Sequence, residues 1–172
     1  DEQREILREI GEIARNERVD AVIIAGDVFD VSVPPATAEE MFYSAASEIA
    51  KSCLVVAIAG NHDDGERLKA PDVLAKVSGI ILAGGFDCSS LSCSPFSGGE
   101  VEGRTGGIVY RKNGERLNLL LCPYLTEARR GDPPAPDFAA YVEKILKERA
   151  ESVFTDDGTN ITVAHLFMLG SS

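Results

Sequence analysis

The stretch that decides the fold covers residues 19–30 and reads Val-Asp-Ala-Val-Ile-Ile-Ala-Gly-Asp-Val-Phe-Asp. Its first half is a short, almost unbroken apolar run, which is typical of a strand buried on both faces of a sheet. A second run of this kind covers residues 53–59 and is followed by Gly60-Asn61-His62-Asp63. Each run predicts a buried strand that stops at a glycine and leads directly into polar side chains.

Helical segments alternate with these strands. Apolar residues recur at helical spacing in residues 4–15 and 37–51, and a shorter helix is predicted for 71–77. We expect Thr37 to cap the second helix, with Glu40 as its capping-box partner. A third short strand is expected at 80–82. This order predicts parallel strand–helix–strand units with right-handed crossovers.

The second half of the chain predicts an antiparallel hairpin. Residues 86–107 are rich in Ser, Gly and Cys and predict one long loop. Asn113-Gly114 separates two strand-like segments, 107–110 and 116–122, and is a strong hairpin signal because both residues accept a positive φ. Further along, the sequence predicts a proline-containing linker at 128–136, an amphipathic helix at 138–150 and a last strand at 161–166.

Length and charge restrict the class of protein. The 172 residues are 44% hydrophobic, which is enough for a packed core, and 17 Lys and Arg against 28 Asp and Glu give a net charge of −11. This balance argues against a broad basic grip on nucleic acid, but not against binding through metal ions or a small basic rim. The longest apolar runs are strand-sized, and the four cysteines are too few for a disulfide scaffold. Reduced thiols and a cytoplasmic location are therefore expected.

Polar side chains follow three of the predicted strands. Asp27 follows the first strand, Asn61 and His62 follow the second, and His165 stands at the end of the last. In open α/β sheets ligands bind at the carboxyl ends of the strands, so we expect these side chains to converge. A carboxylate can bridge two divalent ions, and this mixed set of oxygen and nitrogen donors suits Mn²⁺, Fe or Zn²⁺ better than Ca²⁺.

The motifs resemble those of the calcineurin-like metallophosphoesterases. Gly26–Asp30 and Gly60–Asp63 look like the second and third signature motifs of that family, and residues 20–30, 59–68, 122–125 and 164–167 are similar to its bacterial DNA nuclease subunits. The resemblance implies an α/β fold in which a β-sandwich is flanked by helices (αββα). Residues 1–172 would then form part of a metallophosphoesterase (nuclease) domain that cleaves phosphodiester bonds at DNA ends.

The resemblance also implies a role for individual residues. Asp27 would bridge two divalent metal ions, Mn²⁺ by preference, with Asn61 and His165 as further ligands. His62 would not bind metal but would stabilise the transition state or protonate the leaving oxygen. Asp30 would orient the imidazole of His62, so that the two form a catalytic pair.

Further expectations concern two neighbouring residues and the partners. Arg67 would contact a DNA backbone, although a solvated loop charge is an equally good interpretation, and Asp63 is expected to fix the loop backbone. The family resemblance implies DNA as substrate, a coiled-coil ATPase as partner, a homodimer of the full-length protein, and a role in DNA repair and recombination. No membrane association is expected.

Two family motifs do not occur in the 172 residues. These are an Asp-x-His motif, expected before the opening helix, and a Gly-His-x-His motif, expected some tens of residues after His165. We therefore expect an internal segment of a longer domain, incomplete at both ends, with an exposed sheet edge. Such a segment would bind metal weakly and show little or no phosphodiesterase activity alone.

Other functions remain open at this point. The chain could belong to a phosphoesterase that acts on small phosphate esters, or to a noncatalytic scaffold that binds a partner ATPase without metal. A nucleotide-binding function is disfavoured, because no Gly-x-Gly-x-x-Gly motif follows the first strand and no Walker motif occurs. Cys88 and Cys93 lack a second pair of ligands that would complete a zinc site.

Overall fold

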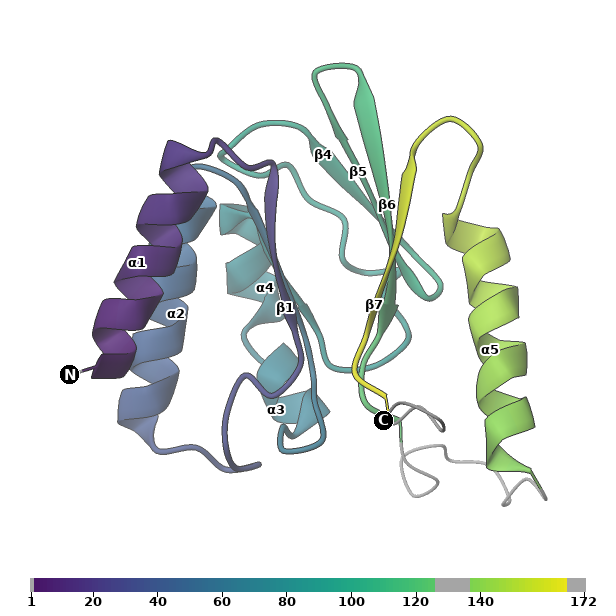
Figure 1. The fold of residues 1–172 in the computed structure, drawn as a ribbon, viewed down its shortest axis with the longest axis horizontal. Helices are drawn as coiled ribbons and strands as arrows, with labels where there is room; N and C mark the ends of the chain where they lie inside the picture. Colours follow the sequence, from purple (N-terminus) through teal and green to yellow (C-terminus); the bar gives the residue numbers. More distant parts are fainter. Residues whose placement is uncertain (1, 126–136, 167–172) are drawn as a thin grey trace.

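The computed structural model describes residues 2–125 and 137–166, so the linker predicted at 128–136 lies outside the described residues (Figure 1). The helices are α1 (Glu2–Asn16), α2 (Ala36–Ala50), α3 (Gly65–Lys69), α4 (Asp72–Ala75) with the short 3₁₀ turn η1 (Lys76–Ser78), and α5 (Phe138–Val153). The strands are β1 (Ala21–Ala25), β2 (Leu54–Ile58), β3 (Ile80–Ala83), β4 (Glu100–Arg104), β5 (Gly107–Lys112), β6 (Glu115–Cys122) and β7 (Thr159–Ala164). No helix of the described residues is both long enough and apolar enough to cross a membrane.

The strands form two sheets. β1, β2 and β3 lie in that order and pair in parallel, as the alternation of strands and helices predicts. The second sheet has the order β4-β5-β6-β7, in which β4, β5 and β6 are antiparallel and β7 pairs in parallel with β6. The turn at Asn113-Gly114 joins β5 to β6 with both residues at positive φ, which confirms the predicted hairpin.

The two sheets stack face to face between layers of helices, with α1 and α2 outside the first sheet and α5 outside the second (Figure 1). Side chains of β2 alternate between the two cores. Leu54, Val56 and Ile58 point into the core between the sheets, whereas Val55 and Ala57 belong to the core under α1 and α2. Burial on both faces explains why β2 is an unbroken apolar run. The predicted αββα sandwich is confirmed.

Three local predictions were wrong or incomplete. β4 lies inside the segment predicted as one long loop, because Glu100–Arg104 contains a glycine and three charged residues and buries only Val101. The short helix α3 was not predicted; the side chain of Asp64 caps its first turn. Thr37 does not cap α2, because this helix begins at Ala36 after Pro35 and has no side-chain cap.

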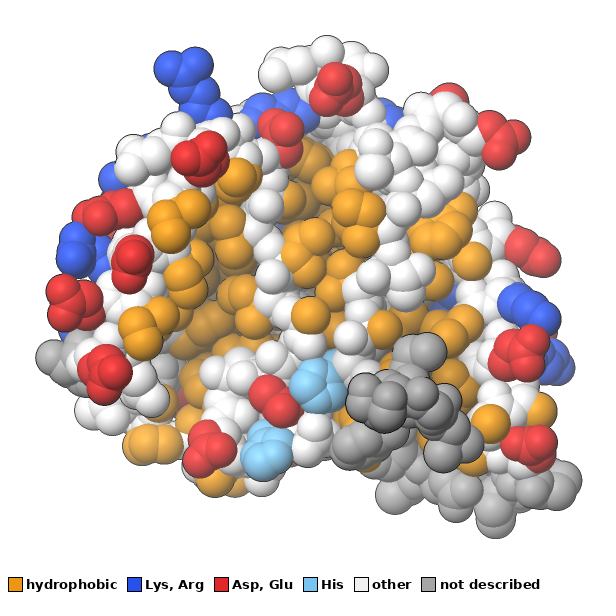
Figure 2. Space-filling model, in the orientation of Figure 1, with side chains coloured by type: hydrophobic (Ala, Val, Ile, Leu, Met, Phe, Trp, Pro, Cys, Tyr) orange, Lys and Arg blue, Asp and Glu red, His pale blue; other side chains and the backbone are white. Residues whose placement is uncertain are grey.

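One face of the molecule exposes apolar side chains beside an open sheet edge. In the described part of the chain, β1 has a partner strand on one side only. Figure 2 shows hydrophobic side chains gathered over the face that runs from α1 across β1 to β7. Ile6, Ile10 and Ile13 of α1 and Ile161 of β7 are exposed large apolar residues of these elements. This face therefore lacks the cover that a parallel sheet normally has on its edge.

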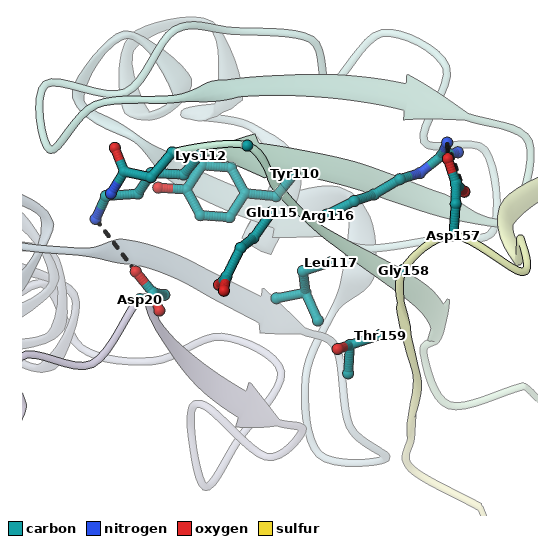
Figure 3. A pocket seen from close by; sticks show the side chains of 11 residues that line it. Asp20, Tyr110, Lys112, Glu115, Arg116, Leu117, Asp157, Gly158 and Thr159 are labelled. Atoms are coloured by element: carbon teal, nitrogen blue, oxygen red, sulfur yellow. Dashed lines mark hydrogen bonds and ion pairs between the residues drawn. The ribbon is translucent and has the colours of Figure 1, made fainter.

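A cavity of about 700 Å³ opens at the end of the sandwich where β1 and β7 begin (Figure 3). The cavity is lined by one lysine and one arginine, and each forms an ion pair with another lining residue. The Nζ atom of Lys112 lies 3.4 Å from Oδ1 of Asp20, and the Nη1 atom of Arg116 lies 3.2 Å from Oδ1 of Asp157. The residues that the sequence singles out for chemistry follow the opposite ends of β1 and β7. The cavity and these residues therefore lie at opposite ends of the sandwich.

Candidate metal centre

The candidate site lies where β1, β2 and β7 end. β1 ends at Ala25 and turns sharply through Gly26 and Asp27, which both have a positive φ (99° and 46°). β2 leads through Gly60 to Asn61, and His165 directly follows β7. A non-glycine residue in the left-handed region is unusual, although aspartate tolerates it better than most. The backbone thus holds Asp27 in a strained conformation of the kind found at functional sites.

Three of the predicted ligand side chains meet here. The Nε2 atom of His165 lies 2.9 Å from the Oδ1 atom of Asn61 and 3.5 Å from the Oδ2 atom of Asp27. The other ring nitrogen, Nδ1, lies 2.9 Å from the main-chain oxygen of Ala25. The structure therefore brings together Asp27, Asn61 and His165 from three strands that are far apart in the sequence.

The chemistry of this cluster fits a metal ion. Because a carbonyl oxygen can only accept, the contact with Ala25 places a proton on Nδ1 of His165. The other ring nitrogen, Nε2, faces an amide oxygen and a carboxylate oxygen, so it is the ring atom that a cation would bind. Three electron-pair donors that converge in this way suit a cation. Histidines that bind a metal through one ring nitrogen usually donate the N–H of the other ring nitrogen to an acceptor such as a main-chain oxygen. Among the described residues, no group of three or more His, Cys, Asp and Glu could hold a metal ion; this cluster has Asn61 as its third member.

Two glycines make the close approach possible. A Cβ atom on Gly26 would lie 2.0 Å from Nδ1 of His165, and one on Gly60 would lie 2.2 Å from Oδ1 of Asp27. Both distances are far shorter than any real carbon contact, so a side chain at Gly26 would displace His165, and one at Gly60 would displace Asp27. Gly26 and Gly60 therefore leave room for the side chains of His165 and Asp27.

The carboxylate of Asp63 braces the two loops. It is 1% exposed and accepts hydrogen bonds from the main-chain N–H groups of Val28 (3.0 Å), Phe29 (2.9 Å) and Gly60 (2.7 Å). A buried carboxylate with three main-chain donors ties the loop after β1 to the loop after β2. The prediction that Asp63 fixes the loop backbone is confirmed.

His62 stands beside the cluster and is about half exposed. Its main-chain N–H donates to Oδ1 of Asp27 (3.1 Å), and its Nδ1 lies 2.8 Å from the main-chain oxygen of Asp30. This hydrogen bond and, secondly, the negative charge of Asp27 raise the pKa of the His62 imidazole. His62 is therefore oriented by a main-chain acceptor, which leaves its Nε2 atom for other contacts.

The carboxylate of Asp30 takes little part in this arrangement. It is fully exposed and lies 3.9 Å from Nδ1 of His62, beyond hydrogen-bond distance. Asp30 and His62 are neighbours as predicted, but the main chain of Asp30 rather than its side chain makes the hydrogen bond. The catalytic role of Asp30 stays a prediction.

Arg67 lies on α3 at the surface and is ion-paired with a residue of α2. Its Nε atom donates to Oε1 of Glu39 on α2 at 2.9 Å. This ion pair and hydrogen bond raise the pKa of Arg67 further above its usual range. The predicted contact with DNA stays a prediction.

Tyr124 had no predicted role, although the Cys122-Pro123-Tyr124-Leu125 motif was part of the resemblance. Its ring stands edge-on to His165, with 6.0 Å between centroids, and its main-chain N–H donates to Ala59 at 2.8 Å. Tyr124 thus connects the loop after β6 to the cluster of Asp27, Asn61 and His165. The position of the motif directly after a strand was the signal that could have identified it.

Comparison with known proteins decides the family. The sequence profile of the calcineurin-like phosphoesterases matches residues 1–170. The chain belongs to the calcineurin-like phosphoesterase family. Members of this family use divalent metal ions, in agreement with the donor set at the ends of β1, β2 and β7.

Several relatives are D subunits of the nuclease SbcCD. The protein from Bacillus subtilis is 35% identical over 176 residues, which cover 99% of this chain and 42% of the relative. The one from Rhodobacter capsulatus is 32% identical over 130 residues, covering 74% and 31%. The one from Escherichia coli K12 is 35% identical over 74 residues, covering 42% and 18%. The chain thus spans less than half the length of these relatives and is similar to nuclease-type phosphoesterases.

Proposed function

We propose that this chain carries part of the active site of a metal-dependent DNA nuclease of the SbcD type, which hydrolyses phosphodiester bonds at DNA ends. The convergence of Asp27, Asn61 and His165 carries the proposal, because it brings together three side chains of types that can bind metal, at the strand ends where the family motifs stand. The similarity over 99% of the chain to the Bacillus subtilis protein supports a nuclease rather than a phosphatase of small esters.

Asp27, Asn61 and His165 would hold the metal, and Mn²⁺ is the ion that we propose. When bound, divalent ions supply positive charge for the phosphoryl oxygens and activate the attacking water. The protein's own contribution at this point is His62. Its Nδ1 is engaged with the Asp30 carbonyl, so its Nε2 would donate the proton to the leaving oxygen. Arg67 would contact the DNA backbone after its ion pair with Glu39 breaks.

We also propose that further metal ligands lie outside residues 1–172 and that this chain alone hydrolyses little. The open edge of β1 supports this. α1 and α2 pack on the same face of the first sheet, so a right-handed crossover through α1 would place an additional parallel strand on the free edge of β1. Its carboxyl end would lie beside Asp27, where a further ligand is needed. Robust Mn²⁺-dependent cleavage of DNA by the purified 172-residue chain would contradict this proposal.

The full-length protein would act with partners. We propose a coiled-coil ATPase of the SbcC type, DNA as substrate, a homodimer, and a role in DNA repair and recombination. The names of the relatives support the complex, since each is a D subunit of the SbcCD nuclease.

The test uses the full-length protein and its His62→Gln variant. We expect Mn²⁺-dependent cleavage of duplex DNA ends and of bis-p-nitrophenyl phosphate, with little hydrolysis of nucleotide monoesters. The variant should lose cleavage while its metal content, measured after dialysis, stays unchanged. Preference for monoesters would favour a small-ester phosphatase, and a metal-free protein that still binds its ATPase partner would favour a scaffold. Loss of metal from the variant would show that His62 is a ligand.

A further inference from the structure

A smaller cavity lies next to the cluster of Asp27, Asn61 and His165. Its volume is about 380 Å³, within the range of about 300–1,000 Å³ that is usual for small-molecule pockets. The start of α3, the loop after β3 and the loop after β6 line it together. The apolar part of the lining consists of Phe86, Pro123, Tyr124 and Leu125. We call this cavity the Tyr124 pocket.

Tyr124 stands between the pocket and the cluster. It lines the pocket, and its ring is edge-on to the ring of His165 with 6.0 Å between the centroids. The main-chain N–H of Tyr124 donates to the oxygen of Ala59 at 2.8 Å, which fixes the backbone at this point. A group bound in the pocket is therefore one aromatic ring away from His165.

Phe86 supplies a second aromatic ring, and α5 holds it in place. The guanidinium of Arg149 lies over this ring, 4.6 Å from its centre, and Nη1 of Arg149 donates to the main-chain oxygen of Phe86 at 2.9 Å. Arg149 thus covers one face of the ring and ties its backbone to α5. Aromatic side chains that are already fixed lose little conformational freedom when a ligand stacks on them.

Glycines shape the space between these rings and α3. The main chains of α3 and of the loop after β3 touch, because a Cβ atom on Gly84 would lie 1.8 Å from the oxygen of Gly65. A Cβ atom on Gly85 would meet no described atom within 4 Å, although Gly85 lines the pocket. A side chain at position 85 would therefore extend into open space rather than into the protein.

The charged residues of the lining are both acidic. Asp64 caps α3, with its Oδ1 atom accepting from the main-chain N–H groups of Glu66 and Arg67. Glu66 lies 3.8 Å from Lys69. Carboxylates repel a phosphate group but accept hydrogen bonds from the amino groups that adenine, cytosine and guanine carry on their edges. An unpaired base, with flat apolar faces and a polar edge, matches this combination of aromatic rings and carboxylates.

We propose that the Tyr124 pocket binds the base of the terminal nucleotide of a DNA strand while the phosphodiester of that nucleotide lies at the cluster. The proposal rests on the proposed function, because it names a subsite for the same substrate. Stacking on aromatic side chains is the usual way in which proteins hold unpaired bases. A base at a strand end has only one neighbour to unstack from, so it enters a pocket at lower cost than an internal base.

Binding of a free nucleoside tests the pocket without hydrolysis. Saturation-transfer NMR of 2′-deoxyadenosine with the metal-free full-length protein should show transfer to the adenine protons. Gly85→Leu, which fills the open space, should remove this signal, whereas the matched control Gly85→Ala should keep it. Phe86→Leu retains an apolar side chain but no ring, and should weaken binding by about fivefold or more. Circular dichroism checks that the variants are folded, and Phe86→Leu decides if Gly85→Leu is not.

Cleavage of duplex DNA by the full-length protein with Mn²⁺ tests whether the pocket serves the substrate. One duplex is normal, and in the other the terminal nucleotides carry tetrahydrofuran in place of the base. We expect the KM of the unmodified protein to be about fivefold or more higher for the duplex without terminal bases. Gly85→Leu should give the same KM for both duplexes, because its pocket is filled.

Two results of the binding experiment would overturn the proposal: no binding of 2′-deoxyadenosine, or binding that persists in a folded Gly85→Leu variant. Nucleoside binding together with an equal KM for both duplexes would also overturn it, because the pocket would then take a free nucleoside and not a base of the substrate. Intact nucleoside binding without any Mn²⁺-dependent cleavage would instead contradict the proposed nuclease function. The two failures are therefore distinguishable.

Discussion

The Nε2 atom of His165 lies 2.9 Å from the Oδ1 atom of Asn61, although 104 residues separate the two in the chain. This contact joins the parallel first sheet to the second sheet at the ends of β2 and β7. The hydrogen bond from Nδ1 to Ala25 fixes the ring, so Nε2 has one direction in which to bind.

The first prediction concerns this histidine. Replacing His165 by Ala in the full-length protein should lower the affinity for Mn²⁺ by about tenfold or more. Removing a residue that only hydrogen-bonds to a metal ligand already lowers metal affinity by about tenfold, and removing a ligand itself should cost at least as much. Isothermal titration with Mn²⁺ measures the change. Tyr124→Phe is the control, because it keeps the ring that stands against His165 and removes no ligand. Unchanged affinity in the His165 variant would exclude this residue from the metal centre.

The second prediction concerns the glycine of the second motif. A Cβ atom at Gly60 would lie 2.1 Å from the main-chain nitrogen of Asp27, and backbone cannot move aside cheaply. Gly60→Ala should lower the free energy of unfolding by about 2 kcal/mol or more, the scale of overpacking in a well-packed region. Urea unfolding of the 172-residue chain measures it.

Gly85 offers the matched control. A Cβ atom there would meet nothing within 4 Å. Gly85→Ala should therefore change the free energy of unfolding by no more than about 0.5 kcal/mol. Equal stability of the two variants would show that a methyl group fits at position 60, contrary to the short distances in the structure.

The third prediction separates two aspartates of neighbouring motifs. Asp63→Asn leaves at most one acceptor oxygen for three main-chain donors, and each buried donor without a partner costs about 1–3 kcal/mol. We expect a loss of about 2–4 kcal/mol of unfolding free energy. Asp30→Asn should leave stability unchanged, because that carboxylate is fully exposed. Urea unfolding measures the free energy of unfolding of both variants. An Asp63→Asn variant as stable as the unmodified chain would show that the Asp63 carboxylate does not hold the two loops together.

The parallel strands and the positions of the site residues were predictable from the sequence because both leave side-chain signals. β2 is buried on both faces and is therefore apolar throughout, and the polar residues after β1 and β2 stand at strand ends. β1 carries a similar apolar run, but its residues are only partly buried, because it lies at the edge of the first sheet in the described part of the chain. The orientation of His62 and His165 was not predictable in the same way. Each ring is held by a main-chain oxygen, of Asp30 and Ala25, and a main-chain acceptor leaves no mark in the residue types.

The last prediction concerns the cysteines and alkaline pH. Burial raises the pKa of Cys88 from 9.0 to about 12 and that of Cys122 to about 11. In the unfolded chain both thiols ionise near pH 9, whereas in the folded chain they stay protonated. Stability from these two groups is therefore complete below pH 9 and is lost as the pH rises from 9 toward 12.

Thiol reactivity follows from the same burial. Iodoacetamide at pH 8 should modify Cys93 first, because it is the cysteine that is not fully buried. Cys88 and Cys122 should react only at the rate at which the chain unfolds, since the thiolate is the reactive form. Mass spectrometry of peptides after timed labelling measures the order. If Cys88 were labelled as fast as Cys93 in the folded chain, the core between the sheets would open readily. The Cys88 thiol would then not be shielded from water, and the predicted loss of stability at alkaline pH would have no basis.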